Sequence, residues 1–136
     1  MNREIKFRGI SIDEWVYGML CKVNEGDTEH GEPIKYKIQT DEKEYGEYVK
    51  CFITNEESIG QFTELYDKNE KEIWENDIVE ITREGIYEKG IIIFKNGCFF
   101  IKSKENLLAL YNCELNNYKV KVIGNITDNP ELLGGE

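Results

Sequence analysis

The stretch TELYDKNEKEIWENDIVEI (63–81) decides how this sequence folds, because it places charged and turn-forming residues directly before an aromatic and aliphatic run. The segment DKNE (67–70) predicts an Asx turn, in which the Asp67 carboxylate accepts the backbone N–H two residues further on. Residues Thr63 to Tyr66, before the turn, form the end of one strand. After the turn, either Ile73 or Trp74 points inward. The first half of the stretch therefore predicts a hairpin.

The second half of the stretch predicts a sharp corner at Glu75-Asn76-Asp77. Asn76 is the best non-glycine candidate for left-handed φ, because its short polar side chain tolerates that conformation. Asp77 can accept hydrogen bonds from the exposed N–H groups of the corner. Ile78 and Val79 then re-enter the core, so the residues before them serve the architecture of the chain.

Alternation of apolar and polar residues dominates the rest of the chain and predicts strands. Between residues 15 and 23, for example, Trp15, Tyr17, Met19, Cys21 and Val23 share one face. The fold class predicted is all-β, a small barrel or sandwich with one or two short helical turns. The roughly nine expected strands lie at residues 5–8, 15–23, 34–39, 48–53, 61–65, 78–82, 87–94, 98–102 and 119–127.

Turn signals support this assignment. Asn96-Gly97 separates two apolar runs and predicts a tight hairpin, because both residues tolerate positive φ. Gly124 and Asn125 are assigned to backbone geometry as well. Residues 129–134 carry an N-cap, a proline at the first helical position and a final glycine, which predict one helical turn. Residues 106–113 fit either a short helix or an irregular strand.

The core is expected to be built from the inward positions of these strands. The residues assigned to it are Ile5, Phe7, Ile73, Trp74, Ile78, Val79, Ile92, Phe94, Phe99, Ile101, Val122 and Leu132.

Composition limits the function classes. The four cysteines are widely spaced and His30 is the only histidine, so no metal site, cofactor or disulfide framework is expected. The free thiols indicate a reducing compartment, and no secretory signal is expected from the first residues. The sequence contains no apolar run of about 20 residues. A net charge of −10 opposes binding to a phosphate backbone. The expectation is a cytoplasmic protein that binds neither membrane nor nucleic acid.

The acidity is concentrated in a loop-rich insertion at about residues 24–47, which contains eight acidic residues and three lysines. A solvated loop pair explains such a segment, and so does an acidic face that meets a basic partner. The candidate interaction residues are Glu25, Asp27, Glu29 and Glu32.

Three stretches resemble the YopX-like family of phage and prophage proteins: REIKFRGI (3–10), IGQFTELYDKNEKEIWENDIVEI (59–81) and VIGNITDNPELL (122–133). The resemblance implies one domain over residues 1–136. Where the family usually carries glycine, this chain has Glu64, Glu70 and Asn76. We expect Asn69, instead of Glu70, to take the unusual backbone conformation of the turn. The resemblance brings no catalytic residues and implies a phage accessory protein without established chemistry.

The expected function is a non-catalytic role through contacts with a protein partner that the sequence does not identify, with self-association as one version of it. Catalysis is not expected, because His30 lies in an acidic, glycine-flanked loop and no nucleotide-binding or hydrolase motif occurs. Two alternatives remain open. One is an acidic decoy that imitates DNA for a host DNA-binding protein, and the other is a small-barrel module that binds nucleic acid through its aromatic residues.

Overall fold

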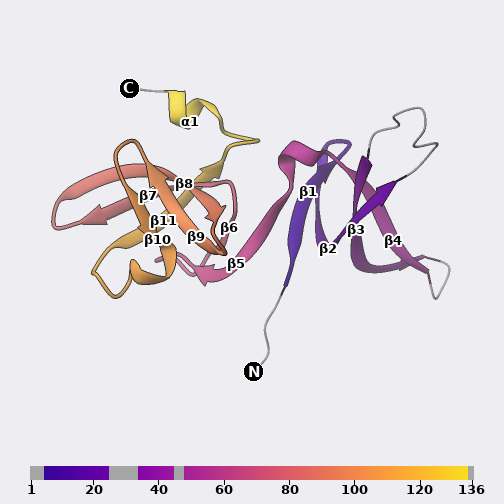
Figure 1. Cartoon of the computed structure of the whole chain (residues 1–136), viewed down its shortest axis with the longest axis horizontal. Coiled ribbons are helices and arrows are strands. Elements are labelled where there is room, and N and C mark those ends of the chain that lie inside the picture. The colour runs from indigo at the N-terminus through magenta and orange to yellow at the C-terminus, as the bar shows by residue number, and fades with distance from the viewer. Residues whose placement is uncertain (1–4, 25–33, 45–47, 135–136) are drawn as a thin grey trace. The chain divides into compact units, whose positions relative to one another are not determined.

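The structure is a computed structural model that describes residues 5–24, 34–44 and 48–134 (Figure 1). The chain divides into two compact units, residues 1–61 and residues 62–136. In the described part of the chain, eleven strands form two antiparallel sheets, with order β4-β3-β2-β1-β5-β6 in one and β10-β9-β8-β7-β11 in the other. The predicted all-β class is confirmed, and both sheets are open instead of closing into a barrel.

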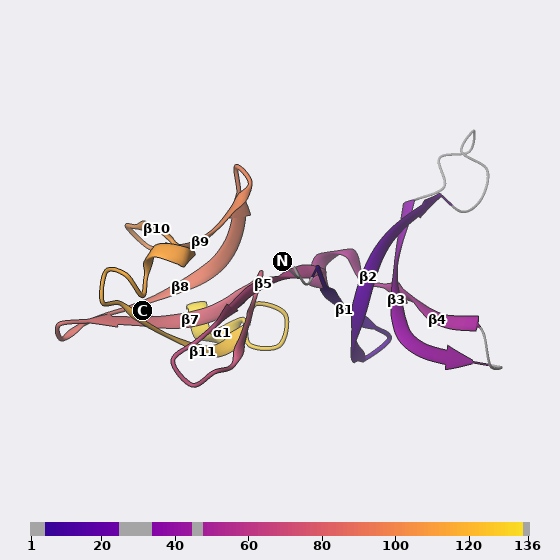
Figure 2. The ribbon, with the colours of Figure 1, turned by 90° about the horizontal axis from the view of Figure 1, so that it is seen from below.

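The first unit is an antiparallel meander. Its strands pair in chain order, β1 with β2, β2 with β3 and β3 with β4. Figure 2 shows that β2 and β3 are strongly curved. The elements are β1 (Phe7–Ser11), β2 (Glu14–Asn24), β3 (Ile34–Glu44), β4 (Tyr48–Thr54) and the short 3-10 helix η2 (Glu56–Ser58).

The buried apolar residues of this meander include Val16 and Ile38. Gly9 in β1 allows the end of β4 to approach closely, because a Cβ at this position would lie 2.2 Å from the Thr54 Cγ2 atom. Asn55 N–H donates to the Ile10 carbonyl over 2.8 Å and ties the end of β4 to β1. The unit is therefore a curled sheet with a thin core.

Strand β5 (Gly60–Tyr66) begins in the first unit and continues into the second. Gly60 and Gln61 pair with β1, whereas Phe62 and Tyr66 pair with β6 (Glu72–Trp74). The β5–β6 connection is the hairpin that the DKNE segment predicts. Asp67 Oδ1 accepts the N–H of Asn69 over 2.8 Å, so the predicted Asx turn is present.

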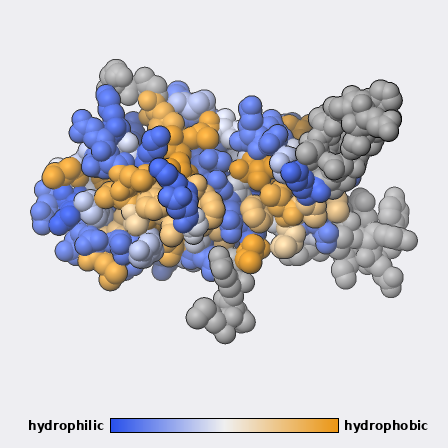
Figure 3. All heavy atoms as spheres, in the orientation of Figure 1, coloured by the Kyte–Doolittle hydropathy of each residue, from blue (hydrophilic) through white to orange (hydrophobic). Residues whose placement is uncertain are grey.

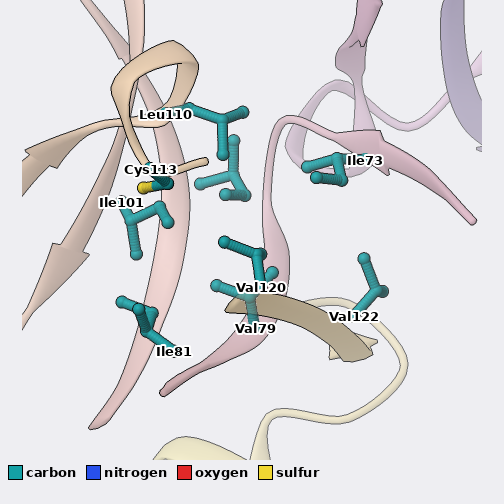
Figure 4. Packing of buried hydrophobic residues seen from close by; sticks show 9 residues of the cluster. Ile73, Val79, Ile81, Ile101, Leu110, Cys113, Val120 and Val122 are labelled. Carbon is teal, nitrogen blue, oxygen red and sulfur yellow. The ribbon is translucent and has the colours of Figure 1, made fainter. Parts of the chain in front are cut away.

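The second unit is built around the five-stranded sheet. Its buried cluster consists of Ile73, Val79, Ile81, Ile92, Ile101, Leu110, Cys113, Val120 and Val122 (Figure 4). The elements that follow β6 are β7 (Asp77–Arg83), β8 (Ile86–Lys95), β9 (Cys98–Ser103), β10 (Leu107–Ala109), the 3-10 helix η3 (Leu110–Asn112), β11 (Lys119–Asn125) and α1 (Glu131–Gly134).

The corner before β7 has the geometry expected from its sequence. Asn76 has φ 76°, and its N–H donates to the Ile92 carbonyl over 2.8 Å. The buried Asp77 carboxylate accepts the Trp74 N–H over 2.7 Å. The corner thus locks β6 against the start of β7.

The other predicted turns lie at strand ends. Asn96 and Gly97 have φ of 53° and 81° and connect β8 to β9. Gly124 follows an irregularity in the pairing of β11 with β7. Asn125 Oδ1 accepts the N–H groups of Thr127 and Asp128, which turns the chain toward α1.

Several expectations from the sequence are wrong. Ile5 is 49% exposed, because β1 begins only at Phe7. Phe94 is 50% exposed, because it lies next to the β8–β9 turn and packs on Phe99 as a cross-strand pair with ring centroids 5.0 Å apart. The DKNE turn puts Glu70, not Asn69, at positive φ, with a value of 63°.

Two segments differ from the predicted elements in kind. Residues 41–44, expected in a loop, belong to β3, because Lys43 and Glu44 pair with Val49 and Tyr48 beyond a shift in register. Segment 106–113, which fits either a helix or a strand by sequence, contains one of each. Strand β10 pairs with β9 over three residues, and the 3-10 helix η3 follows it directly. The helical turn predicted near the C-terminus is α1.

Candidate functional site

An open groove of about 600 Å³ lies in the second unit. Its walls come from the end of β5 and the turn after it, from the segment between η3 and β11, and from the start of β11. The volume falls in the range of about 300–1,000 Å³ that is common for ligand sites. It is the candidate site of this chain.

The floor of the groove is apolar and belongs to the core cluster. Ile73, Leu110, Cys113 and Val120 line it, and each is at most 8% exposed. Figure 4 shows Leu110 and Cys113 near each other, and Val120 beside Val79. An apolar side chain that enters the groove therefore contacts an apolar surface. Each Å² of apolar surface buried in this way contributes about 25 cal/mol of binding free energy.

Tyrosines form much of the rim. Tyr66 at the end of β5 is 56% exposed and Tyr111 in η3 is 62% exposed, and both line the groove. Tyr118 is held in place, since its hydroxyl accepts from Arg83 Nη1 at 3.3 Å and the guanidinium carbon lies 5.0 Å from its ring centroid. The Tyr118 hydroxyl raises the pKa of Arg83 further. Tyr66 also packs edge-on against Phe62, with ring centroids 5.8 Å apart. The groove is thus lined by two half-exposed tyrosines and by Tyr118, which Arg83 holds in place.

The Asp67 side chain connects two walls of the groove, the turn after β5 and strand β11. Its Oδ2 accepts the Val122 N–H over 2.9 Å, and its Oδ1 accepts the N–H groups of Asn69 and Lys71. Lys68 N–H adds a bond to the Val120 carbonyl at 2.9 Å. The turn of the hairpin therefore covers the free edge of β11 and fixes the shape of the groove.

The electrostatics of Asp67 reflect these bonds. Burial raises the pKa of its carboxyl group, but the three N–H donors and the Lys71 charge outweigh burial and hold the pKa below its ordinary value of 3.8. The carboxylate is ionised at neutral pH, and three donors occupy its oxygens. Its role is to hold the wall, not to exchange protons with a ligand.

The other reactive group of the groove is the Cys113 thiol. Burial raises the pKa of this thiol above its ordinary value of 9.0, so it is protonated at neutral pH. Its Sγ lies 3.6 Å from the Ala109 carbonyl, to which the S–H can donate. A protonated, buried thiol is a weak nucleophile and behaves as a small apolar side chain.

Charges on the rim are close to balance. Lys68 and Lys119 line the groove together with Glu114, and all three are exposed. The groove therefore offers apolar and aromatic contact with polar edges. That combination suits an amphipathic segment better than a strongly charged ligand.

The candidate interaction residues from the sequence, Glu25, Asp27, Glu29 and Glu32, lie outside the described residues. The decoy hypothesis built on them stays a prediction. The candidate turn residues Asn76, Asp77, Asn96, Gly97, Gly124 and Asn125 lie at separate strand ends and do not line the groove.

No local sequence pattern predicts the groove. Its walls come from positions as distant as Leu65 and Val120, and no local pattern records that proximity. One signal was present: Tyr66 and Tyr111 each lie beside a predicted turn or irregular segment, where a strand pattern no longer assigns an aromatic side chain to the core.

Within the described ranges, no group of three or more His, Cys, Asp and Glu side chains could hold a metal ion. In the same ranges no helix has the length and apolarity to cross a membrane.

The fold has a solved counterpart. The crystal structure of protein EF1440 from Enterococcus faecalis superimposes with a TM-score of 0.58 at 24% sequence identity, over 97% of this chain and 99% of that one. At this identity the likeness shows the fold alone. A search of curated proteins finds no match. The family model described as YopX protein matches residues 6–134, nearly the whole sequence, and the chain therefore belongs to the YopX family.

Proposed function

We propose that this protein is a non-catalytic accessory protein of phage or prophage origin that acts inside the bacterial host by binding a protein partner. In this proposal the groove of the second unit receives an extended segment of the partner. One observation carries it: Tyr66 and Tyr111 stand half exposed over a buried apolar floor.

The residue types of the groove favour a protein segment as occupant. Tyrosine is enriched at interface hot spots, because it buries a large ring at small entropic cost and keeps a polar tip for hydrogen bonds. An apolar anchor of the partner would fill the floor at Leu110 and Val120. Polar neighbours of that anchor would lie near Lys68 and Glu114.

The balance of charge on the rim favours the same occupant over a nucleic acid. A phosphate backbone needs an excess of lysine and arginine, whereas here Lys68 and Lys119 are offset by Glu114 and Asp67. The non-catalytic part of the proposal is supported by Asp67 and Cys113, one fully hydrogen-bonded and the other protonated.

The test compares two substitutions in one segment. Tyr111 and Leu115 are both exposed, at 62% and 80%, but Tyr111 lines the groove and Leu115 does not. The partner is captured with the wild-type chain, identified by mass spectrometry, purified and titrated against both variants. Tyr111→Lys is expected to weaken binding about thirtyfold, as a hot-spot loss of about 2 kcal/mol implies, and Leu115→Lys less than about threefold.

Equal affinity of Tyr111→Lys and the wild type for the purified partner would remove the groove from the proposal. Conversion of a bound molecule into a new product by the purified chain would overturn its non-catalytic part. Steep loss of affinity with salt, for generic duplex DNA, would favour the nucleic-acid alternative instead.

A further inference from the structure

The two sheets have four edge strands, β4 and β6 in one and β10 and β11 in the other. These strands differ in length and in whether another segment bonds to their outer edge. β6 and β10 are three residues long. The edge of β11 is occupied by the hairpin turn, through the bonds of Lys68 and Asp67 to Val120 and Val122. β4 is seven residues long, and within the described residues it pairs with β3 alone. β4 is therefore the long open edge of the described structure.

The sequence of β4, YVKCFIT, does little to protect that edge. Lys50 is its one charged residue, although 32% of the whole chain is charged. The other residues are mainly aromatic or β-branched, the types that favour strands. Natural proteins usually shield a long edge with several charges, a proline, a bulge or a covering loop, because an unshielded edge pairs with another strand. Of these, β4 has Lys50 and the register shift in its pairing with β3 between Gln39 and Lys43.

The outward face of the strand is also apolar. Ile53 is 54% exposed and Cys51 is exposed, and alternation puts both on the same side. On the next strands this face is mixed, because Ile53 pairs with Lys37, Cys51 pairs with Gln39, and Gln39 pairs with Met19, which is 53% exposed. A strand added beside β4 would extend this exposed face.

We propose that β4 pairs antiparallel with β4 of a second copy of this chain, so that the sheet continues across two copies. This surface belongs to the first unit and is separate from the proposed function of the groove. A second copy fits because an antiparallel edge is self-complementary about a two-fold axis perpendicular to the sheet. Such an axis keeps the buried faces of both copies on one side.

The full-length overlap of β4 fixes the register. With its seven residues paired end to end, the central Cys51 lies opposite Cys51 of the second copy, and Lys50 lies opposite Phe52 of that copy. Directly opposed residues of an antiparallel pair have Cα atoms about 4.5–5.5 Å apart. A disulfide needs a Cα separation of about 4.4–6.8 Å, so the two thiols can be joined.

Oxidative cross-linking of the full chain tests this register. Copper–phenanthroline with dissolved oxygen removes two electrons and two protons from a pair of thiols and leaves a disulfide. The matched control is Cys98, also exposed but on β9. Wild type and Cys98→Ser should form a covalent dimer linked through Cys51, and Cys51→Ser should not. A dimer linked only through Cys98, or no covalent dimer, would overturn the proposal.

Sedimentation of the reduced protein tests the pairing without a disulfide. The wild type should sediment as a dimer at micromolar concentration. Cys51→Lys places like charges directly opposite each other and should raise the dissociation constant about tenfold or more, whereas Cys98→Lys should leave it unchanged. A wild type that stays monomeric over the concentration range, or a folded Cys51→Lys variant that dimerises normally, would contradict the β4 interface.

Discussion

Glu64, Glu70 and Asn76 occupy left-handed backbone in the second unit, with φ of 70°, 63° and 76°. The resemblance to YopX-like proteins implies glycine at these three positions. A side chain with a Cβ pays roughly 1 kcal/mol or more for this conformation, and Asn pays less than Glu because it can hydrogen-bond locally. The chain therefore holds strain at two glutamates that its family pattern avoids.

Glu70→Gly should stabilise the protein by about 1 kcal/mol, because it releases the strain of an L-residue at φ 63°. The control is Glu105→Gly, at an exposed glutamate without positive φ, which should lower stability slightly through the entropy of the unfolded chain. Urea unfolding measures both. Destabilisation by Glu70→Gly would contradict the strained turn.

Asn76→Ala should destabilise the protein by about 1 kcal/mol, since it leaves a Cβ in left-handed space without a local hydrogen bond. Asn76→Gly should have an effect close to zero, because glycine adopts φ 76° freely. Unfolding midpoints of the two variants distinguish this account from a simple loss of side-chain contacts, which would make the glycine variant the less stable one.

At these residues the sequence predicted the Asn76 corner correctly and the Glu70 turn wrongly. The rule that Asn prefers left-handed φ favoured Asn69. In the structure Asp67 Oδ1 takes the N–H groups of Asn69 and Lys71, and the Asp67 carbonyl takes that of Glu70. Those hydrogen bonds fix the turn so that Glu70 has positive φ. They outweigh the preference of Asn over Glu for the left-handed conformation.

Among the elements, the β5–β6 hairpin depends most on one side chain. Asp67 satisfies the N–H of Val122, 55 residues away, as well as two N–H groups of its own turn. Its folded pKa lies below the unfolded value of 3.8. The stability it contributes is therefore fully present above about pH 3.8 and is lost as the pH falls through the lower, folded pKa.

Asp67→Asn should lower stability by about 2 kcal/mol at pH 7, because a neutral amide replaces a carboxylate that accepts three N–H groups. The gap between the wild type and this variant should narrow as the pH falls below about 3.8. Urea unfolding of both proteins from pH 7 to pH 2.5 measures it. A constant gap over that range would mean that the charge of Asp67 does not stabilise the hairpin.

Element prediction succeeded where a local rule sufficed. Alternation found nine of the eleven described strands and missed the three-residue strands β6 and β10. Asn96-Gly97 found the β8–β9 hairpin, because both residues accept positive φ. Alternation did not say which face of β2 is buried: Val16 is 9% exposed, whereas Tyr17 is 45% exposed. That choice depends on the curl of the neighbouring strands, which bring Thr54 against Gly9. The groove depends in the same way on segments far apart in the sequence.

On the scale of the whole molecule, β5 links the two compact units by a continuous strand. It pairs with β1 at Gly60 and Gln61 and with β6 at Phe62 and Tyr66. Unfolding of either unit would release part of that strand. The chain is therefore predicted to behave as one cooperative domain, with a single transition in scanning calorimetry and equal calorimetric and van't Hoff enthalpies. Two resolved transitions would show that the units unfold independently.

Photo-cross-linking inside cells tests whether a protein partner binds in the groove. A photoreactive phenylalanine analogue is placed at position 111 in one variant and at position 115 in another, since Tyr111 lines the groove and Leu115 does not. We expect one defined protein adduct from position 111 and little adduct from position 115. Because Tyr66 lines the same groove, Tyr66→Lys should abolish the adduct at position 111. Equal adducts from both positions, or an adduct at 111 that Tyr66→Lys leaves intact, would contradict binding in the groove.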